Sequence, residues 1–472
     1  MTVSDKGTRK KVIERALADY DDGHYMEELR RRVAIPTESQ NPERLPELYR
    51  YLQEDIGPAF ENMGYEWQVF DNPFEGQGPV LLAERIEDPG LPTVLGYGHG
   101  DVIRGYEDQW REGLGPWNVV QEGDRFYGRG TADNKAQHTV HMRALECVLG
   151  VRGRLGFNSK FLVETGEENG SKGLEEIVRD NRDVFAADAF IASDGPRVSV
   201  ERANITLGNR GAMNFDLVCE LRDGGHHSGN WGGLLANPGI ILAHAIASIT
   251  TAKGRIQIRE WLPEPIPNSV RDALKDITRQ GGPDAPEMDP AWGEPDLTQP
   301  EKVYAWNTFE VLAFRTGNPD NPVNAIPPKA TAHCQIRFVV GSDSDGFLPA
   351  LRKHLDSHGF QQVTIQPPPA GNAAGFKPAR TDPDHPWARW VAAAIERTTG
   401  EKTVVLPNSG GSICNYIFQD YLGVPTIWIP HSYTGCCQHA PNEHILGSVT
   451  REAMAITAAL YWDLGESPPR AQ

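Results

Sequence analysis

Imidazole and carboxylate side chains recur after short apolar runs in the first 200 residues of the chain. Four motifs carry them: "YGHGDV", "GRGTADNK", "ETGEEN" and "IASDG". The residues are His99, Asp101, Asp133, Glu167, Glu168 and Asp194. Imidazole and carboxylate groups bind zinc and related divalent ions, and a carboxylate that is not bound to a metal can transfer protons. The motifs together predict a metal-assisted acid–base site.

Each motif alone also has an ordinary structural explanation. His99 and Asp101 could form a simple hydrogen bond, Asp133 could cap the helix after it, and Asp194 could be a turn residue. The glutamate pair could be part of a solvated face. All four motifs, however, are placed at the ends of expected strands, where ligands of open α/β sheets bind. We therefore expect them to meet in one site.

The spacing of the first motif predicts how its histidine is oriented. Residues two apart lie on the same side of a strand, so Asp101 is expected to hydrogen-bond the ring of His99. A carboxylate behind a metal-binding imidazole fixes its tautomer and direction.

Charge balance predicts two metal ions. Asp133, Glu168 and Asp194 in one pocket would repel one another without cations, and two divalent ions would balance three carboxylates and a hydroxide. Zinc suits these ligands, with manganese or cobalt as alternatives. A second imidazole is expected from "GCCQHAPNEH" near the C-terminus, which offers His439 and His444.

Composition narrows the class of protein. The chain has 472 residues, a net charge of −18 and a hydrophobic content of 39%, which indicate a folded protein without a nucleic-acid or anionic-membrane surface. Its six cysteines lack the spacing of a disulfide framework or a zinc ribbon, and Cys436 and Cys437 are adjacent. The N-terminus lacks an apolar signal core, and no run is long enough to span a membrane. We expect a soluble, cytoplasmic protein.

The alternation of elements predicts an α/β fold. Amphipathic helices are expected at 10–34 and 44–63, and strands and helices then alternate up to residue 195, which favours a mostly parallel central sheet covered on both faces. Residues 204–221 are typical of two strands joined by a glycine-containing turn, and residues 261–323 of long loops.

The return of alternating strands and helices near the C-terminus predicts a discontinuous domain. The predicted division is a catalytic domain at 1–202 and 371–472, interrupted by an α+β domain at 203–370. There are no internal repeats.

The whole set of motifs resembles the co-catalytic dinuclear zinc metallopeptidases. This family includes carnosine dipeptidase, carboxypeptidase G, aminoacylase-1, acetylornithine deacetylase and succinyl-diaminopimelate desuccinylase. Besides the four motifs above, the resemblance rests on "GNRG", "HHSGNWGG", "NAIPPKATAHCQIR", "GGSI" and "CQHAPNE", in the family's order along nearly the whole chain. It implies a zinc-peptidase catalytic domain with an inserted lid and dimerisation domain.

The resemblance implies a role for each candidate ligand. His99 and Asp194 would bind one metal, Glu168 and His439 the other, and Asp133 would bridge the two, with a cis peptide bond between Asp133 and Asn134. Asp101 would support His99.

It also implies a catalytic group. Glu167 would activate a metal-bridging water for attack on the amide and then pass a proton to the leaving amine.

The inserted domain is implied to complete the site in a homodimer. His227 of "HHSG" would stabilise the oxyanion, often in the partner's site. Arg337, Asn324, Gly411 and Ser412 would bind the substrate, chiefly its carboxylate.

The implied reaction is hydrolysis of a peptide or amide bond in a small substrate with a free carboxylate. Asp194 and the long insertion are similar to the dipeptidase branch, which usually has an Arg-Glu pair before "GGSI". Here the pair is Asn408-Ser409. An N-acyl- or N-carbamoyl-amino-acid amidohydrolase is therefore the alternative, and a non-catalytic binding protein on the same fold a more remote one.

Overall fold

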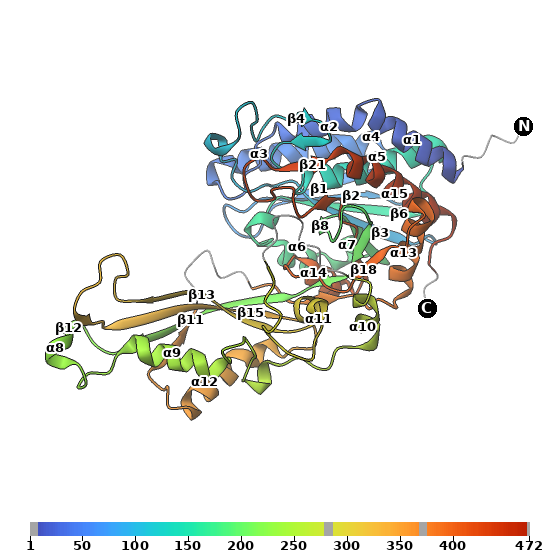
Figure 1. The fold of residues 1–472 in the computed structure, drawn as a ribbon. Coiled ribbons are helices and arrows are strands. Elements are labelled where there is room, and N and C mark those ends of the chain that lie inside the picture. Colours follow the sequence, from blue (N-terminus) through green and yellow to red (C-terminus); the bar gives the residue numbers. More distant parts are fainter. Residues whose placement is uncertain (1–7, 278–286, 368–374, 470–472) are drawn as a thin grey trace, which may run out of the picture.

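The protein consists of a compact unit and a long, narrow one that projects from it (Figure 1). The structure is a computed structural model that describes residues 8–277, 287–367 and 375–469. An eight-stranded sheet lies at the centre of the compact unit. In spatial order its strands are β1 (Glu66–Phe70), β2 (Val80–Arg85), β6 (Asn158–Glu164), β3 (Thr93–His99), β7 (Ala189–Ala192), β19 (Thr426–Trp428), β9 (Asn204–Thr206) and β18 (Val404–Leu406).

The middle of this sheet is parallel, as the sequence predicts. β6, β3, β7 and β19 run in one direction, whereas β1 and β2 form an antiparallel edge. Every residue of β6 is buried, because helices cover both faces of the sheet.

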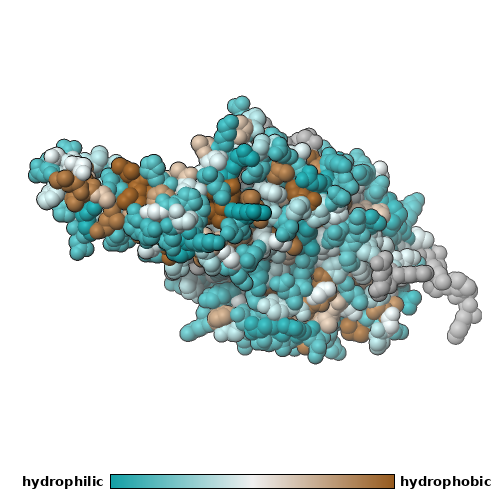
Figure 2. Space-filling view, turned by 90° about the horizontal axis from the view of Figure 1, so that it is seen from below, coloured by the Kyte–Doolittle hydropathy of each residue, from teal (hydrophilic) through white to brown (hydrophobic). Residues whose placement is uncertain are grey.

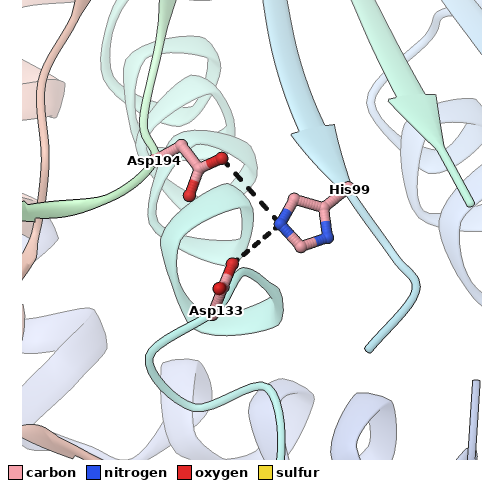
Figure 3. A group of neighbouring side chains, drawn as sticks. All are labelled: His99, Asp133 and Asp194. Carbon is pink, nitrogen blue, oxygen red and sulfur yellow. Dashed lines mark hydrogen bonds and ion pairs between the residues drawn. The ribbon is translucent and has the colours of Figure 1, made fainter. Parts of the chain in front are cut away.

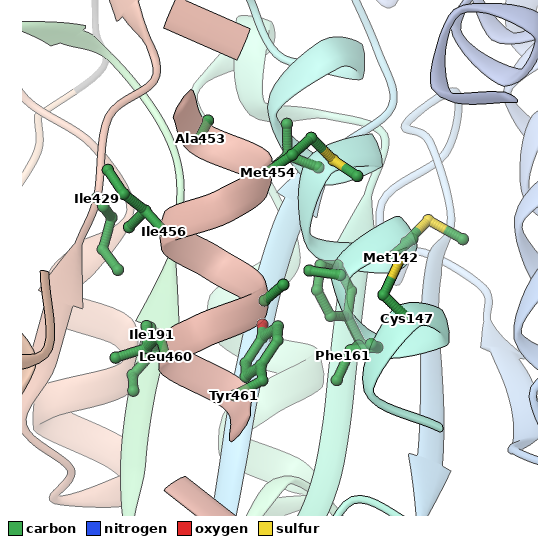
Figure 4. Packing of buried hydrophobic residues seen from close by; sticks show 14 of the residues in the cluster. Met142, Cys147, Phe161, Ile191, Ile429, Ala453, Met454, Ile456, Leu460 and Tyr461 are labelled. Atoms are coloured by element: carbon green, nitrogen blue, oxygen red, sulfur yellow. The ribbon is translucent and has the colours of Figure 1, made fainter. Parts of the chain in front are cut away.

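Two helical layers enclose the sheet. On one face are α1 (Arg9–Asp21), α2 (His24–Val33), α5 (Lys135–Arg152), α13 (Pro386–Thr399) and α15 (Gly447–Glu466). On the other are α6 (Leu174–Asp180), α7 (Arg182–Phe185) and α14 (Asn415–Leu422). Figure 4 shows Met454 and Tyr461 of α15 packed beside α5 and the strands.

No described helix combines the length and apolar character needed to cross a membrane.

The projecting unit, here called the lid, contains an antiparallel sheet with one apolar and one polar face. Its strands are β13 (Thr308–Thr316), β15 (Lys329–Phe338), β11 (Gly211–Glu220) and β16 (Val363–Gln366), in that spatial order. Along β15, buried residues alternate with less buried ones, as a half-covered strand requires. Helices α9 (Pro238–Ile249) and α12 (Phe347–Ser357) cover the apolar face.

Residues 204–221 form strands on both sides of their glycines, as expected, but the two main strands do not pair with each other. β9 belongs to the eight-stranded sheet and β11 to the lid sheet, so this stretch is the passage between the two units. The chain leaves the eight-stranded sheet after Thr206, and the predicted division at residue 203 stays a prediction. A glycine-containing turn looks alike in sequence whether it closes a hairpin or separates two sheets.

The stretch expected to form long loops contains short helices that join the two units. Residues 262–277 and 287–306 of this stretch are here called the connecting segment. Its helices are α10 (Asn268–Leu274) and α11 (Gln299–Tyr304). Val270 and Leu274 of α10, and Ala305 directly after α11, form a small core with β18. Between these two helices, the Gly293 N–H donates to the carbonyl of Lys253 in the lid over 2.7 Å.

Short elements complete the described chain. The helical ones are η1 (Pro42–Arg44), α3 (Leu45–Arg50), η2 (Tyr51–Ile56), α4 (Gly57–Asn62), η3 (Glu107–Gln109), η4 (Glu167–Asn169), α8 (Ser228–Trp231), η5 (Arg259–Trp261) and η6 (Ser344–Gly346). The strands are β4 (Val120–Glu122), β5 (Arg125–Tyr127), β8 (Pro196–Arg197), β10 (Gly208–Asn209), β12 (His226–His227), β14 (Ala325–Ile326), β17 (Ala379–Arg380), β20 (Ser432–Tyr433) and β21 (His444–Leu446).

Candidate metal centre and active site

The parallel strands deliver the predicted ligands to one edge of the sheet. β3 ends at His99, and Asp194 lies two residues beyond the end of β7. β6 ends at Glu164, directly opposite His99 in the register, and leads into the turn η4 that contains Glu167 and Glu168. Because parallel neighbours end on the same side, these residues meet there.

A first group of possible metal ligands consists of His99, Asp133 and Asp194 (Figure 3). The Nε2 atom of His99 lies 2.8 Å from Oδ1 of Asp133 and 3.9 Å from Oδ2 of Asp194. Asp133 is in the loop before α5, and the peptide bond between it and Asn134 is cis, as predicted.

A second group shares Asp133. The Nε2 atom of His439 lies 3.1 Å from Oδ2 of Asp133 and 3.1 Å from Oε2 of Glu168. In each group the candidate donor atoms lie within 4.8 Å of one another. One aspartate therefore presents one oxygen to each group, which is the arrangement expected of a bridging ligand.

The alternative imidazole points elsewhere. The His444 ring lies against Tyr127, and its Nε2 atom is 2.5 Å from the hydroxyl of Tyr433. The structure thus brings His439, and not His444, to the cluster.

Asp101 supports His99 in a different way from the one expected. The ring Nδ1 of His99 is 3.0 Å from the backbone carbonyl of Asp101, whereas the nearest Asp101 carboxylate oxygen is 3.5 Å away. β3 ends at His99, so the strand geometry behind the prediction does not extend to Asp101. Its carboxylate instead accepts the backbone N–H groups of Glu167 and Glu168, at 3.2 and 3.1 Å. Asp101 thus connects the His99 ring to the glutamate turn.

The donor set fits divalent metal ions. A proton on Nδ1 of His99, donated to the Asp101 carbonyl, leaves the Nε2 lone pair facing two carboxylates, a contact that a cation between them would relieve. Burial and the neighbouring Asp133 raise the pKa of Glu168 to about 7 and that of Asp194 to about 6. Both effects, loss of water and mutual repulsion, disfavour the charged form of clustered carboxylates, and a bound cation would offset them.

Glu167 lines the same cavity as Asp133 and Asp194 but belongs to neither group. Burial raises its pKa well above the ordinary value, and the charges of Asp194 and Glu168 add to the effect. A carboxyl group whose pKa is raised in this way is a stronger base than an ordinary glutamate, which suits a group that accepts and then returns a proton.

The sequence motifs did not assign a role to Glu443, which holds the loop before Asp133. Its Oε1 atom accepts the N–H groups of Gly130, Ala132 and Asp133 at 3.0, 2.8 and 3.1 Å. Its Oε2 atom accepts from Nη1 of Arg129 at 2.6 Å, and both side chains are 1% exposed. Its place four residues after His439, in "HAPNE", was the available signal.

A cavity of about 1110 Å³ extends from the ligand cluster toward the lid. Of the predicted substrate-binding residues, Gly411 and Ser412 line it. Nη1 of Arg337 donates to Oγ of Ser412 over 2.9 Å. The hydroxyl of Ser412 in turn donates to the carbonyl of Arg210 over 2.7 Å. The structure brings Arg337, Gly411 and Ser412 together at the cavity.

His227 and Asn324 lie elsewhere in the same chain. β12, which contains His227, is at the far end of the lid, away from β3 (Figure 1). The Asn324 carbonyl accepts from the Ser228 N–H at 2.9 Å, so the two predicted residues are neighbours. Their roles stay predictions.

The adjacent cysteines next to His439 are not joined: Cys436 is buried and Cys437 exposed, without a disulfide between them.

Sequence comparison identifies the family. Residues 95–463 match the description Peptidase family M20/M25/M40. The chain belongs to this family. The resemblance inferred from the motifs is thereby confirmed.

Individual relatives in the family are dipeptidases by name. The chain is 30% identical over 264 residues to the Beta-Ala-His dipeptidase of Rattus norvegicus, which covers 53% of each protein. It spans about half the length of the Beta-Ala-His dipeptidases it matches. It is 23% identical to the Cys-Gly metallodipeptidase DUG1 of Saccharomyces cerevisiae, covering 94% of this chain and 96% of that protein.

Comparison with solved structures supports the same fold. Human carnosine dipeptidase 1 superposes with a TM-score of 0.76 at 23% identity, covering 97% of this chain and 99% of that one. The predicted α/β class, with a mostly parallel central sheet, is confirmed.

Proposed function

We propose that this protein is a metal-dependent hydrolase of the dipeptidase type, which cleaves the amide bond of a small substrate with a free carboxylate. The observation that carries the proposal is that two imidazole–carboxylate groups share Asp133. The carboxyl group of Glu167 lies in the same cavity and belongs to neither group. The names of the relatives support the reaction class.

The two groups would hold two divalent ions per chain. His99 and Asp194 would bind one, Glu168 and His439 the other, and Asp133 both. Mixed nitrogen and carboxylate donors suit zinc, with manganese or cobalt as substitutes. When bound, such ions supply Lewis acidity, which polarises a carbonyl and makes water a stronger acid.

Glu167 would carry the proton. It would accept one from the attacking water and deliver it to the nitrogen of the leaving amine, which must be protonated to depart. Asp101 holds the backbone of the glutamate turn, so Glu167 and Glu168 keep their separate directions. Arg337, Gly411 and Ser412 would bind the substrate carboxylate and place the amide beside Glu167.

We further propose that the active form is a homodimer formed through the lid. The lid exposes large apolar side chains, and Figure 2 shows brown atoms on its projecting end. They include Trp231, Leu234, Ile240, Leu312, Phe314 and Val323. Contiguous exposed apolar groups are typical of interfaces. A second lid packed there would allow His227 and Asn324 to enter the partner's cavity.

A cytoplasmic location stays a prediction.

Substitution of the two adjacent glutamates tests the reaction. Glu167→Gln is expected to keep its metal content and to lose about 10²- to 10⁴-fold in kcat, because only the proton carrier is removed. Glu168→Ala is expected to lose metal, since one ligand group is broken. The readouts are metal analysis and hydrolysis of a dipeptide panel with added zinc, manganese or cobalt.

A matched control is available on the next helix. Glu176, in the first turn of α6, does not line the cavity, so Glu176→Gln should match the wild type. If both Glu167 and Glu168 variants kept metal and activity, the proposed division of roles would be wrong.

A further inference from the structure

The lid sheet presents a row of polar side chains to the cavity. In the register of β13 and β15, Thr308 is opposite Arg337 and Glu310 is opposite Gln335. Opposite residues of an antiparallel pair project from the same face. Nε of Arg337 donates to Oε1 of Gln335 over 3.0 Å, so the row is continuous. Thr308 and Glu310 line the cavity that contains Asp133 and Glu167.

Glu310 is the acidic residue that the lid sheet contributes to this cavity. Within the described ranges, no hydrogen bond or ion pair of its carboxylate is found, and its side chain is exposed to solvent. Desolvation by the cavity wall nonetheless raises the pKa of Glu310, and the nearby Arg210 counteracts the shift. The carboxylate is therefore partly removed from bulk water, and among the described residues it has the nearby charge of Arg210 but no hydrogen bond or ion pair.

Most other acids of the cavity already have a task. Asp133 and Asp194 belong to the candidate metal groups, and Glu167 is the proposed proton carrier. Glu294 pairs with Arg255 at 3.4 Å.

Two further acids lie in a different part of the wall. Glu287 and Asp289 are exposed residues of the connecting segment, next to the stretch that packs on Lys253 at the base of the lid. Glu310, by contrast, lies on the strand beside Arg337. It is the acid placed beside the residues proposed to bind the substrate carboxylate.

The loop before Gly411 supplies no negative charge. Asn408 is fully buried, and its Nδ2 atom donates to the carbonyl of Tyr304 over 2.7 Å. The Ser409 hydroxyl donates to the carbonyl of Gly411 over 3.0 Å. The donor groups of both side chains are thus used by backbone carbonyls, one in the connecting segment and one in the loop itself. A cationic group in this part of the cavity would find its counter-charge on the lid side.

We propose that Glu310 binds the protonated α-amino group of a dipeptide and so selects substrates with a free over a blocked amino terminus. This inference rests on the proposed function. A dipeptide carries one charge at each end. The carboxylate of Glu310 lines the cavity, and the guanidinium of Arg337, in the next row of the same sheet, is hydrogen-bonded to the cavity residue Ser412. A charge-assisted hydrogen bond in a partly desolvated site is stronger than one in water.

The experiment compares matched substrates with and without the amine. Alanyl-leucine and propionyl-leucine share the scissile amide and the carboxylate and differ in the amino group alone; two further pairs replace leucine with glycine and with histidine. We expect the zinc-loaded wild type to prefer the free-amine member of each pair. Glu310→Gln should lower kcat/KM for that member about 10- to 100-fold and leave propionyl-leucine unchanged within about twofold.

Controls separate the possible outcomes. Glu260→Gln, an exposed lid position that does not line the cavity, should behave as wild type, and Glu310→Asp should restore part of the preference. If Glu310→Gln lowered kcat/KM equally for both members of a pair, or for neither, the inference would be overturned while the proposed function stood. A wild type that preferred propionyl-leucine would also overturn it. Failure of the wild type to cleave any amide would overturn the proposed function and the inference with it.

Discussion

Glu443 offers a direct test of how the loop that carries Asp133 is held. Its two oxygens have separate partners: Oε1 accepts the three loop N–H groups, and Oε2 accepts from Arg129. Glu443→Gln can keep the oxygen that faces the loop, but it turns an amide NH₂ toward the guanidinium. Glu443→Ala removes both the acceptor for the loop and the charge that faces Arg129. The two variants therefore separate the ion pair from the loop contacts.

The burial of this pair determines the size of the effect. Because Arg129 and Glu443 are each 1% exposed, removing one charge leaves the other uncompensated, which costs about 3–5 kcal/mol of unfolding free energy. Glu443→Ala also leaves three N–H groups without an acceptor, at about 1 kcal/mol or more each. We expect Glu443→Gln to lose stability but to retain zinc affinity within about tenfold. Glu443→Ala should lose a further 10- to 100-fold in affinity, as supporting residues of metal sites do.

The assay measures the two properties independently. Urea unfolding of the chelated protein gives stability, and competition with a zinc chelator gives affinity. Glu122→Gln is the matched control: its partner Arg111 is 53% exposed and Glu122 44% exposed, so its loss should cost less than about 1 kcal/mol. Equal zinc affinity in Glu443→Ala and the wild type would show that Glu443 does not hold the Asp133 loop.

The site leads to three other predictions. His227→Ala should lower kcat and keep the metal content. Mixing this variant with Glu167→Gln should restore part of the activity, because one of the two sites in a mixed dimer would have both an intact Glu167 and the partner's intact His227. If no activity returned, His227 would not act in the site of the other subunit. Arg337→Met should raise KM for dipeptides about tenfold or more, measured against an amide without a carboxylate, which should be unaffected. Zinc affinity should rise with pH between about 5.5 and 7.5. The pKa values of Asp194 and Glu168 are raised to about 6 and about 7, so protons compete with the metal for these carboxylates at lower pH. Competition with a chelator at several pH values measures the affinity, and the absence of a rise would contradict the prediction.

The meeting of the candidate ligands at one edge of the sheet could be predicted from the sequence, because they come at or after strand ends. His99 and Asp194 sit at or just beyond parallel strands, and parallel strands have one carboxyl edge. His439 was different. Residue type alone could not separate it from His444, and only the resemblance chose between them. Its backbone has a φ of 61°, in the left-handed region, which turns this stretch in a way that no periodicity reveals.

Contacts between distant segments could not be predicted. Glu443 and the loop it holds are more than 300 residues apart in sequence. The Asp101 carboxylate binds backbone N–H groups, and these leave no trace in residue types. Glu310 could be placed in the cavity only once the register of β13 against β15 was known. Residue patterns specify which elements form, whereas these contacts depend on how the elements pack.

The connecting segment has a consequence for how the protein moves. A lid joined to the rest by only its two ends would swing about them like a hinge. Here a third attachment runs between them: α10 and α11 pack on β18, and residues near Gly293 hold the base of the lid. Rotation of the lid would have to pull Val270 and Leu274 out of their apolar contacts with the sheet edge. Any change in the angle between the two units must therefore break these contacts as well as bend the two ends of the lid.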